Sequence, residues 1–209
     1  MSKEKGKFAR YLEEQDIQIS AKRYFVDAMG AMAQGLFASL LIGTILNTLG
    51  GQLNIPILVT IGGFATAVMG PAMGVAIGRA LNAPPYVLFS LAAVGYAACA
   101  EGGAGGPLAV FIIALIACEC GKLVSKRTPV DLLVTPLVTI LVGGLLSIGI
   151  APYIGIGASA VGRAIMWATD LQPFLMGILV SLIVGVALTL PISSAAICAG
   201  LGLVGLAGG

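Results

Sequence analysis

The chain of 209 residues is 58% hydrophobic and only 10% charged, with a mean hydropathy of +1.05 and a net charge of +2. This composition excludes an ordinary soluble domain, and the basic residues lie at the ends of apolar runs, which excludes a nucleic-acid-binding surface. Lipid cannot hydrogen-bond a backbone, and the apolar runs are long and continuous. The sequence therefore predicts an all-α, polytopic helical membrane protein whose surroundings are a lipid bilayer.

Residues 1–23 are polar and mixed in charge, which predicts a cytoplasmic amphipathic segment ahead of a transmembrane domain over 24–209. A signal peptide is the competing interpretation, but the region is too long and no small-x-small cleavage site follows it. The segment is therefore expected to stay attached to the domain.

The apolar runs predict six or seven transmembrane helices. Their approximate ranges are 25–48, 54–78, 85–100, 107–121, 132–151, 173–190 and 192 to the end. With the N-terminus in the cytoplasm, the basic residues fall on the inner side except Arg163, as the positive-inside rule requires. The last segment, ICAGLGLVGLAGG, ends without a charged or aromatic flank, so we expect the natural chain to continue beyond it.

Two stretches interrupt this simple pattern. In the second run, VMGPAMG places Pro71 in the middle of a helix, where it should kink or break it; close packing of small residues is the other explanation of this stretch. The stretch 154–173 is too polar for a span. We expect an anchored outer connection there with a short interfacial helix carrying Arg163 and Trp167, and a lid over an outer cavity is the alternative.

The stretch YAACAEGGAGGPLAV, residues 96–110, places an acid and four glycines between two apolar runs. Each run is about 15 residues long, or roughly 22–24 Å as a helix, against a hydrocarbon core of roughly 30 Å. The sequence therefore predicts a re-entrant or broken-helix turn below the outer surface, where backbone survives only if it is buried in protein or lines a cavity. An ordinary outer loop with a solvated acid is the alternative.

The residues of this turn are the main candidates for binding a solute, because short glycine-interrupted segments that meet within a membrane are typical of solute sites. A second candidate is LPISSAA, where two hydroxyls cap a helix or contact a polar solute. The predicted substrate-binding residues are Glu101, Gly102, Gly103, Gly105, Gly106, Ser193 and Ser194.

The sequence predicts no catalytic residue, cofactor or metal. The four cysteines lie in apolar runs and are interpreted as small packing residues, since Cys118-Glu119-Cys120 lacks the Cys-x-x-Cys spacing of a metal or redox pair. Glu119 and Lys122, at i and i+3, are expected to form an ion pair at the cytoplasmic interface, with a role in a proton or ion path as the alternative.

Four stretches of the chain resemble one known family. They are FVDAMGAMAQGLFASLLIGTIL, YAACAEGGAGGPLAV, PVDLLVTPLVTI and LPISSAAICAGLGLVGLAGG. They are similar to membrane proteins of the phosphotransferase-system EIIC type 2 family (PTS_EIIC_2), which includes the perfringolysin O regulator. The family is longer, and about its first two-thirds is present.

The resemblance implies a bacterial inner-membrane permease related to the sugar-translocating component of the phosphotransferase system. It also implies that Glu101 hydrogen-bonds sugar hydroxyls. The chain has no histidine, so it carries no phosphoryl-relay residue of that kind.

Two functions remain open. One is a carrier that binds and translocates a small polar, sugar-like solute, and the other is a membrane sensor or regulator that uses the same fold without transport. An ion channel with Glu101 in a selectivity ring is conceivable, an enzyme is the weakest reading, and a homodimer is left open.

Overall fold

The computed structural model describes residues 15–17, 20–127 and 130–169, with five further positions at 177–178, 181–182 and 185. The elements in this part of the chain are helical, as predicted. A first long helix, Arg23–Gln52, comprises the π-helical turn η1 (Arg23–Ala28), α2 (Met29–Leu36), the π-helical turn η2 (Phe37–Leu41) and α3 (Ile42–Gln52). It is followed by α4 (Pro56–Ala67), α5 (Met69–Ala80), α6 (Pro85–Gly102), the short η3 (Gly103–Gly105), α7 (Gly106–Val124) and α8 (Asp131–Thr169).

Proline and asparagine set the turns between the first helices. Asn54 and Asn82 both have φ of 54°, the left-handed conformation that asparagine tolerates better than most residues. Pro56 and Pro85 then begin α4 and α6, where the missing N–H of proline costs no helical hydrogen bond. The sequence thus folds into antiparallel hairpins joined by short turns.

The core lies between α2, α5, α6, α7 and the first part of α8. Its fully buried side chains include Met32, Leu36, Met73, Ile77, Leu91, Val94, Val110 and Ile113. Glycines let these helices approach closely: a Cβ added at Gly35 would lie 2.7 Å from the carbonyl oxygen of Ala72. The small residues of α5 and α6 pack in the same way, with Gly70 facing Gly95, so the packing explanation of VMGPAMG is confirmed.

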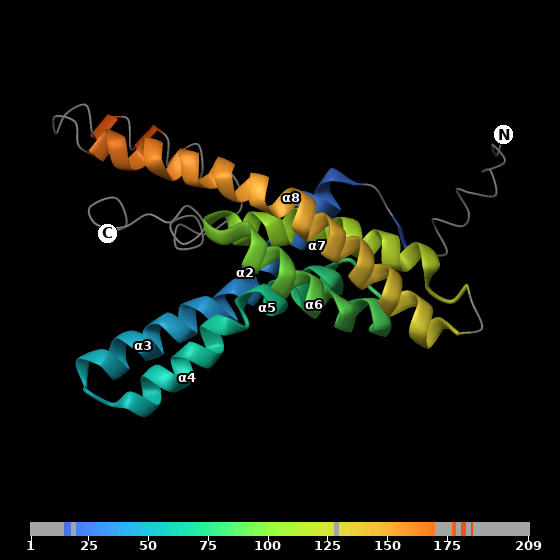
Figure 1. The fold of residues 1–209 in the computed structure, drawn as a ribbon, viewed down its shortest axis with the longest axis horizontal. Helices are drawn as coiled ribbons and strands as arrows, with labels where there is room; N and C mark the ends of the chain where they lie inside the picture. Colours follow the sequence, from blue (N-terminus) through green and yellow to red (C-terminus); the bar gives the residue numbers. More distant parts are fainter. Residues whose placement is uncertain are drawn as a thin grey trace.

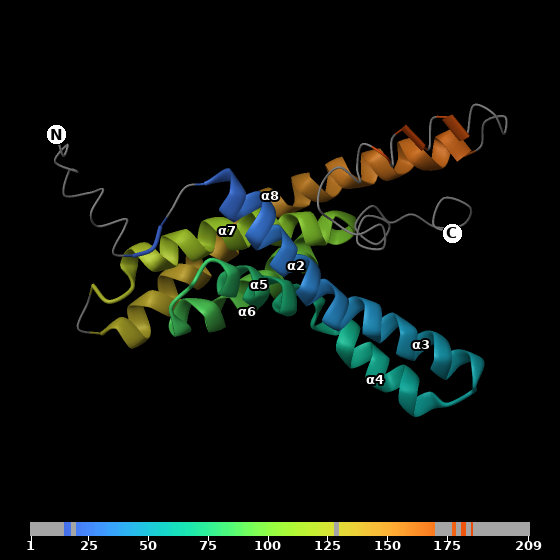
Figure 2. The same ribbon diagram turned by 180° about the vertical axis from the view of Figure 1, so that it is seen from behind.

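The prediction that Pro71 would break the second span is also confirmed. α4 and α5 are bent by 45° at Val68. Pro71 has no N–H to donate to the carbonyl of Ala67, so the helical ladder is interrupted one turn before it. The bend directs the α3–α4 hairpin away from the other helices (Figures 1 and 2).

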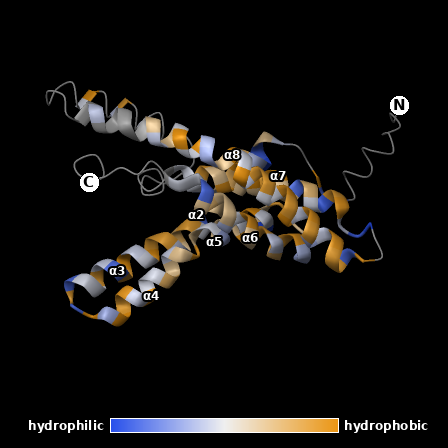
Figure 3. Ribbon diagram, viewed as in Figure 1, coloured by the Kyte–Doolittle hydropathy of each residue, from blue (hydrophilic) through white to orange (hydrophobic). Residues whose placement is uncertain are grey.

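Three helices of the described part are long and apolar enough to cross a membrane: Arg23–Gln52, Gly106–Val124 and Asp131–Ala160. The bent pair α4 and α5 makes a fourth if it forms one span. Hydrophobic residues colour much of α3, α4 and α8 in Figure 3, and exposed apolar side chains such as Phe64 and Ile57 match a lipid environment. The predicted spans at 173–190 and 192 to the end lie outside the described residues, and six or seven spans remain a prediction.

The prediction of a short interfacial helix within 154–173 was wrong. Residues 154–169 are helical but continue α8 without a break, although α8 contains Pro136 and Pro152. A proline within a long helix costs a hydrogen bond but does not end the helix when the surrounding turns hold. Trp167 is exposed on this continuation.

Candidate functional site

The turn between α6 and α7 contains five of the predicted substrate-binding residues. Glu101 lies in the last turn of α6 and is exposed, and Gly102 ends the helix. Gly103 has φ of +49°, a conformation that favours glycine, and lets the chain reverse through η3. α7 then begins at Gly106, and its N-cap residue, Gly105, has no side chain to cap the first-turn amides.

The turn packs directly against the middle of α8. A Cβ added at Gly105 would lie 3.0 Å from the carbonyl oxygen of Ile154, and one added at Gly155 would lie 2.5 Å from that of Gly102. Gly105 and Gly106 are buried, and Gly106 faces Cys99 across the hairpin. Close helix packing therefore accounts for glycine at these positions, and their contact with a solute stays a prediction.

The helices beside this turn are longer than the sequence predicted. α6 has 18 residues and α7 has 19, instead of about 15 each. At 1.5 Å per residue they measure about 27 and 29 Å, close to the thickness of a hydrocarbon core. The apolar runs underestimated the lengths of these helices, because helical hydrogen bonding continues past the apolar residues to polar ones such as Glu101 and Lys122.

The turn is nevertheless set back within the molecule. Both the α3–α4 hairpin and the far part of α8 extend beyond the end of the α6–α7 hairpin (Figures 1 and 2). This arrangement comes from the bend at Val68 and from the unbroken length of α8. Because α6 and α7 are nearly as long as the hydrocarbon core is thick, the helix-length argument for a buried turn was wrong, and the depth of the turn in the membrane stays a prediction.

A cavity of about 150 Å³ lies beside the turn, where the bend between α4 and α5 meets α6. It is lined by Thr66, Ala67, Met69, Gly70, Pro71, Tyr96, Cys99 and Ala100. Ala67 carries the carbonyl that Pro71 leaves without a helical donor, and Ala100 directly precedes Glu101. A broken helix, a cavity and an acid thus lie close together in the fold.

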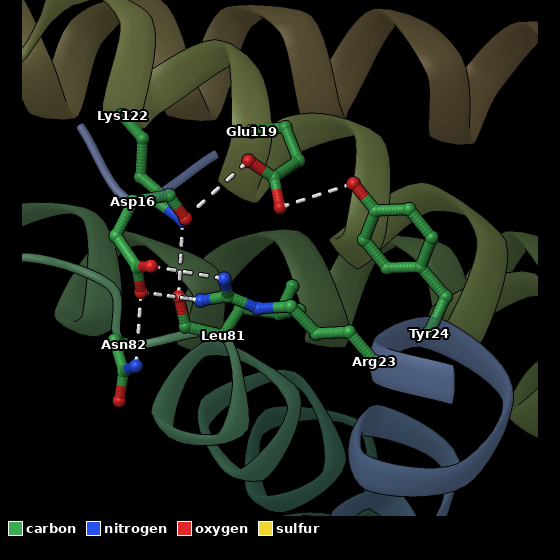
Figure 4. A network of polar contacts seen from close by, with 7 residues as sticks. All are labelled: Asp16, Arg23, Tyr24, Leu81, Asn82, Glu119 and Lys122. Atoms are coloured by element: carbon green, nitrogen blue, oxygen red, sulfur yellow. Dashed lines mark hydrogen bonds and ion pairs between the residues drawn. The ribbon is translucent and has the colours of Figure 1, made fainter. Parts of the chain in front are cut away.

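A cluster of charged side chains lies at the other end of α7, whose last turn carries Lys122. Figure 4 shows its members from close by. Arg23, at the start of the first helix, donates hydrogen bonds of 3.1 and 2.6 Å to the two carboxylate oxygens of Asp16. Asn82, after α5, donates a third bond of 2.9 Å to the same carboxylate. The paired geometry is the strong, directional form of an arginine–carboxylate contact.

Lys122 joins α7 to this cluster. Its side chain is fully buried, and its ammonium donates to the backbone carbonyls of Asp16, at 2.7 Å, and Leu81, at 3.0 Å. Its predicted ion pair with Glu119 is confirmed at 3.5 Å. The hydroxyl of Tyr24 donates to the other oxygen of Glu119 at 3.4 Å. Both of these contacts with the carboxylate of Glu119 are long.

Arg23 and Asn82 hold the pKa of the Asp16 carboxyl well below its usual value of 3.8, with further help from the charge of Lys122. Because the pKa of Asp16 is lower in the folded protein than in the unfolded chain, these contacts stabilise the folded state fully above the unfolded pKa. The stabilisation is lost as the pH falls below that value. At pH 7 we expect the free energy of unfolding of wild type to exceed that of Asp16→Asn by about 1 kcal/mol. This figure is kept small because the Asp16 side chain is 37% exposed and solvent screens its charge.

This advantage should stay constant down to about pH 5 and shrink below about pH 4, because the carboxyl of the unfolded chain then takes up a proton while that of the folded protein stays ionised. Unfolding of both proteins in detergent from pH 7 to pH 3 measures it. A difference that grows on acidification would contradict the contact.

Sequence reasoning found Glu119 and Lys122 but missed Asp16, Arg23 and Asn82 as partners. The first two looked like ordinary members of a mixed-charge lead-in, and the third like a turn residue. Two signals were available in the sequence. Arg23 stands directly at the start of the first apolar run, and Lys122 stands at the end of another. Ser193 and Ser194 lie outside the described residues.

Comparison with known proteins agrees with the sequence resemblance. The profile of the family described as "Phosphotransferase system, EIIC" matches residues 26–209, which is most of the chain. No curated protein and no solved structure matches the chain. The chain therefore belongs to the phosphotransferase system EIIC family and is a sugar-transport-related membrane component.

Proposed function

We propose that this protein binds and translocates a small polar, sugar-like solute, and that Glu101 accepts hydrogen bonds from its hydroxyl groups. The observation that carries the proposal is the position of Glu101 at a set-back turn beside the cavity at the bend of α4 and α5. Acids at such places in membrane proteins are rare and mark solute or ion paths. The family is consistent with a sugar as the solute.

The polar groups near the cavity suit a solute with several hydroxyls. Of the residues that line the cavity, Ala67 carries the freed carbonyl, an acceptor, and Tyr96 adds a hydroxyl that both donates and accepts. Glu101 follows the lining residue Ala100 in α6, and we propose that its carboxylate turns toward the solute. A cavity of about 150 Å³ is smaller than the roughly 300–1,000 Å³ of most ligand pockets. A whole sugar would therefore require the bend to open, with Ser193 and Ser194 as further proposed contacts.

The proposed topology places the N-terminus in the cytoplasm of a bacterial inner membrane that the chain crosses several times. The contacts of Arg23 and Lys122 with the carbonyl of Leu81 bring basic residues of the first helix and of α7 together at the end of α5. Position 163 lies in the far part of α8. This distribution supports an inner location for the charged end.

The test is ligand stabilisation of the purified protein by sugars, sugar acids and polyols. A solute that raises the melting temperature of wild type should bind about 10- to 100-fold more weakly to Glu101→Gln, because one charged hydrogen-bond acceptor is lost. Asp27→Asn, a change at an exposed acid far from the turn, should bind as wild type does. Equal affinity of wild type and Glu101→Gln would overturn the role of this residue.

A sensor or regulator with the same fold is the second candidate. One observation favours it: the lead-in is tied through Asp16 to the ends of α5 and α7, so a partner that binds the lead-in would act on the helices directly. Deletion of residues 1–20 should then abolish regulation and leave solute binding intact. Regulation that survives the deletion would argue against this candidate.

A further inference from the structure

The N-terminal lead-in presents one carboxylate to a ready-made set of donors. Asp16 receives two hydrogen bonds from Arg23 and one from Asn82, although Asp16 lies outside any helix. Its backbone has φ of +51°, which a non-glycine residue adopts at a cost. The contacts with the donors offset that cost, so residue 16 behaves as a ligand held in a receptor.

The receptor is built from the first helix, the turn after α5 and the last part of α7. Arg23 and Lys122 both donate to the carbonyl of Leu81, at 2.8 and 3.0 Å, which fixes the end of α5 between the first helix and α7. Lys122 also donates to the backbone carbonyl of Asp16. The lead-in is therefore bonded to all three elements at once (Figure 4).

The charges of the cluster balance only while Asp16 is in place. Arg23 and Lys122 are two buried cations. Without Asp16, the described carboxylates near them are Glu119, at 3.5 Å from Lys122, and Asp27, which lines the same cavity as Arg23 but is exposed. An uncompensated buried cation is costly, so an empty receptor favours either a new anion or separation of the helix ends. A cavity of about 340 Å³ beside Asp16 gives a small anion room to enter.

We infer that Arg23 and Asn82 form an oxyanion receptor which the Asp16 carboxylate occupies as a tethered ligand, that Lys122 holds the backbone carbonyl of Asp16 beside it, and that this occupancy latches the ends of α5 and α7 together. The receptor takes a carboxylate because the two N–H groups of Arg23 match its two oxygens. The latch lies at the charged end of the helices, opposite the turn with Glu101. It does not depend on the function proposed for that turn.

The native Cys118 reports on the latch, because its side chain is fully buried one turn before Lys122 on α7. The background protein carries Cys99→Ser, Cys120→Ser and Cys198→Ser. In this background, a soluble disulfide reagent should modify Cys118 about five- to tenfold faster in Asp16→Asn than in the parent. Asn keeps the size and backbone preference of Asp16 and loses only the charge. Glu101→Gln, at an exposed acid on the opposite end of the helices, is the matched control and should react as the parent does.

Chemical rescue then separates a receptor from a merely stabilising contact. In Asp16→Gly the carboxylate is gone but the left-handed backbone is allowed, so added acetate should enter the receptor and restore the protection of Cys118. Chloride at the same ionic strength should not, and acetate should fail in the double variant Asp16→Gly/Arg23→Gln. Unchanged Cys118 reactivity in Asp16→Asn would overturn the latch, and equal effects of acetate and chloride in Asp16→Gly would overturn the receptor.

Discussion

Replacing Lys122 by methionine should destabilise the protein by about 3–5 kcal/mol, the largest loss of stability that we predict for a single change. The Lys122 side chain is fully buried, and methionine fills similar space without any donor. The carbonyls of Asp16 and Leu81 each lose a hydrogen bond, and Glu119 loses its ion pair. The measurement is reversible unfolding in detergent.

Two further variants make this result specific. Glu119→Gln added to Lys122→Met should recover part of the loss, because no buried carboxylate then lacks its cation. Lys126→Met changes an exposed lysine four residues later and should alter stability by less than about 0.5 kcal/mol. Equal stability of Lys122→Met and wild type would show that the buried ammonium contributes nothing.

Replacing Gly155 by alanine should also have a large effect, because the turn of Glu101 rests on this residue. The added Cβ would lie 2.5 Å from the carbonyl oxygen of Gly102, and a backbone atom cannot move aside as a flexible side chain does. We expect a loss of about 1–3 kcal/mol and a matching fall in solute binding as the turn shifts away from α8. Thermal unfolding and ligand titration measure the two effects.

Gly157 is the natural control for Gly155. It lies two residues further along α8, and a Cβ there meets nothing within 4 Å. Gly157→Ala should leave binding unchanged and raise stability by up to about 1 kcal/mol, since alanine favours a helix over glycine. If both variants lose the same stability, the close contact between α8 and the turn is not present in the protein.

The positions of the first five helices could be predicted from the sequence because each is a long apolar run in a protein whose backbone has only lipid around it. The break in the second helix was visible from Pro71 alone. The ends were less accessible: α6 continues through Glu101, and α8 continues past Pro152, because hydrogen bonding and not hydropathy decides where a helix stops. The apolar runs therefore predicted where the helices lie but not where each one ends.

The charged end could not be assembled from the sequence. Asp16 and Lys122 are 106 residues apart, and the shared acceptor is the backbone carbonyl of Leu81, which no side-chain pattern reveals. Only the Glu119–Lys122 pair lies within one helical turn and was predicted. The glycines near Glu101 illustrate the same limit, since their packing partners on α8 are about fifty positions away.

The bend at Val68 turns the α3–α4 hairpin into a lever. α4 has 12 residues, so its tip at Pro56 lies about 18 Å from the bend, and a rotation of about 10° would displace that tip by about 3 Å. The pivot is the region where Gly70 packs against Gly95, and Gly70 lines the cavity together with Ala100, the residue before Glu101. A change of packing too small to reorganise the core would thus be magnified at the far edge of the molecule.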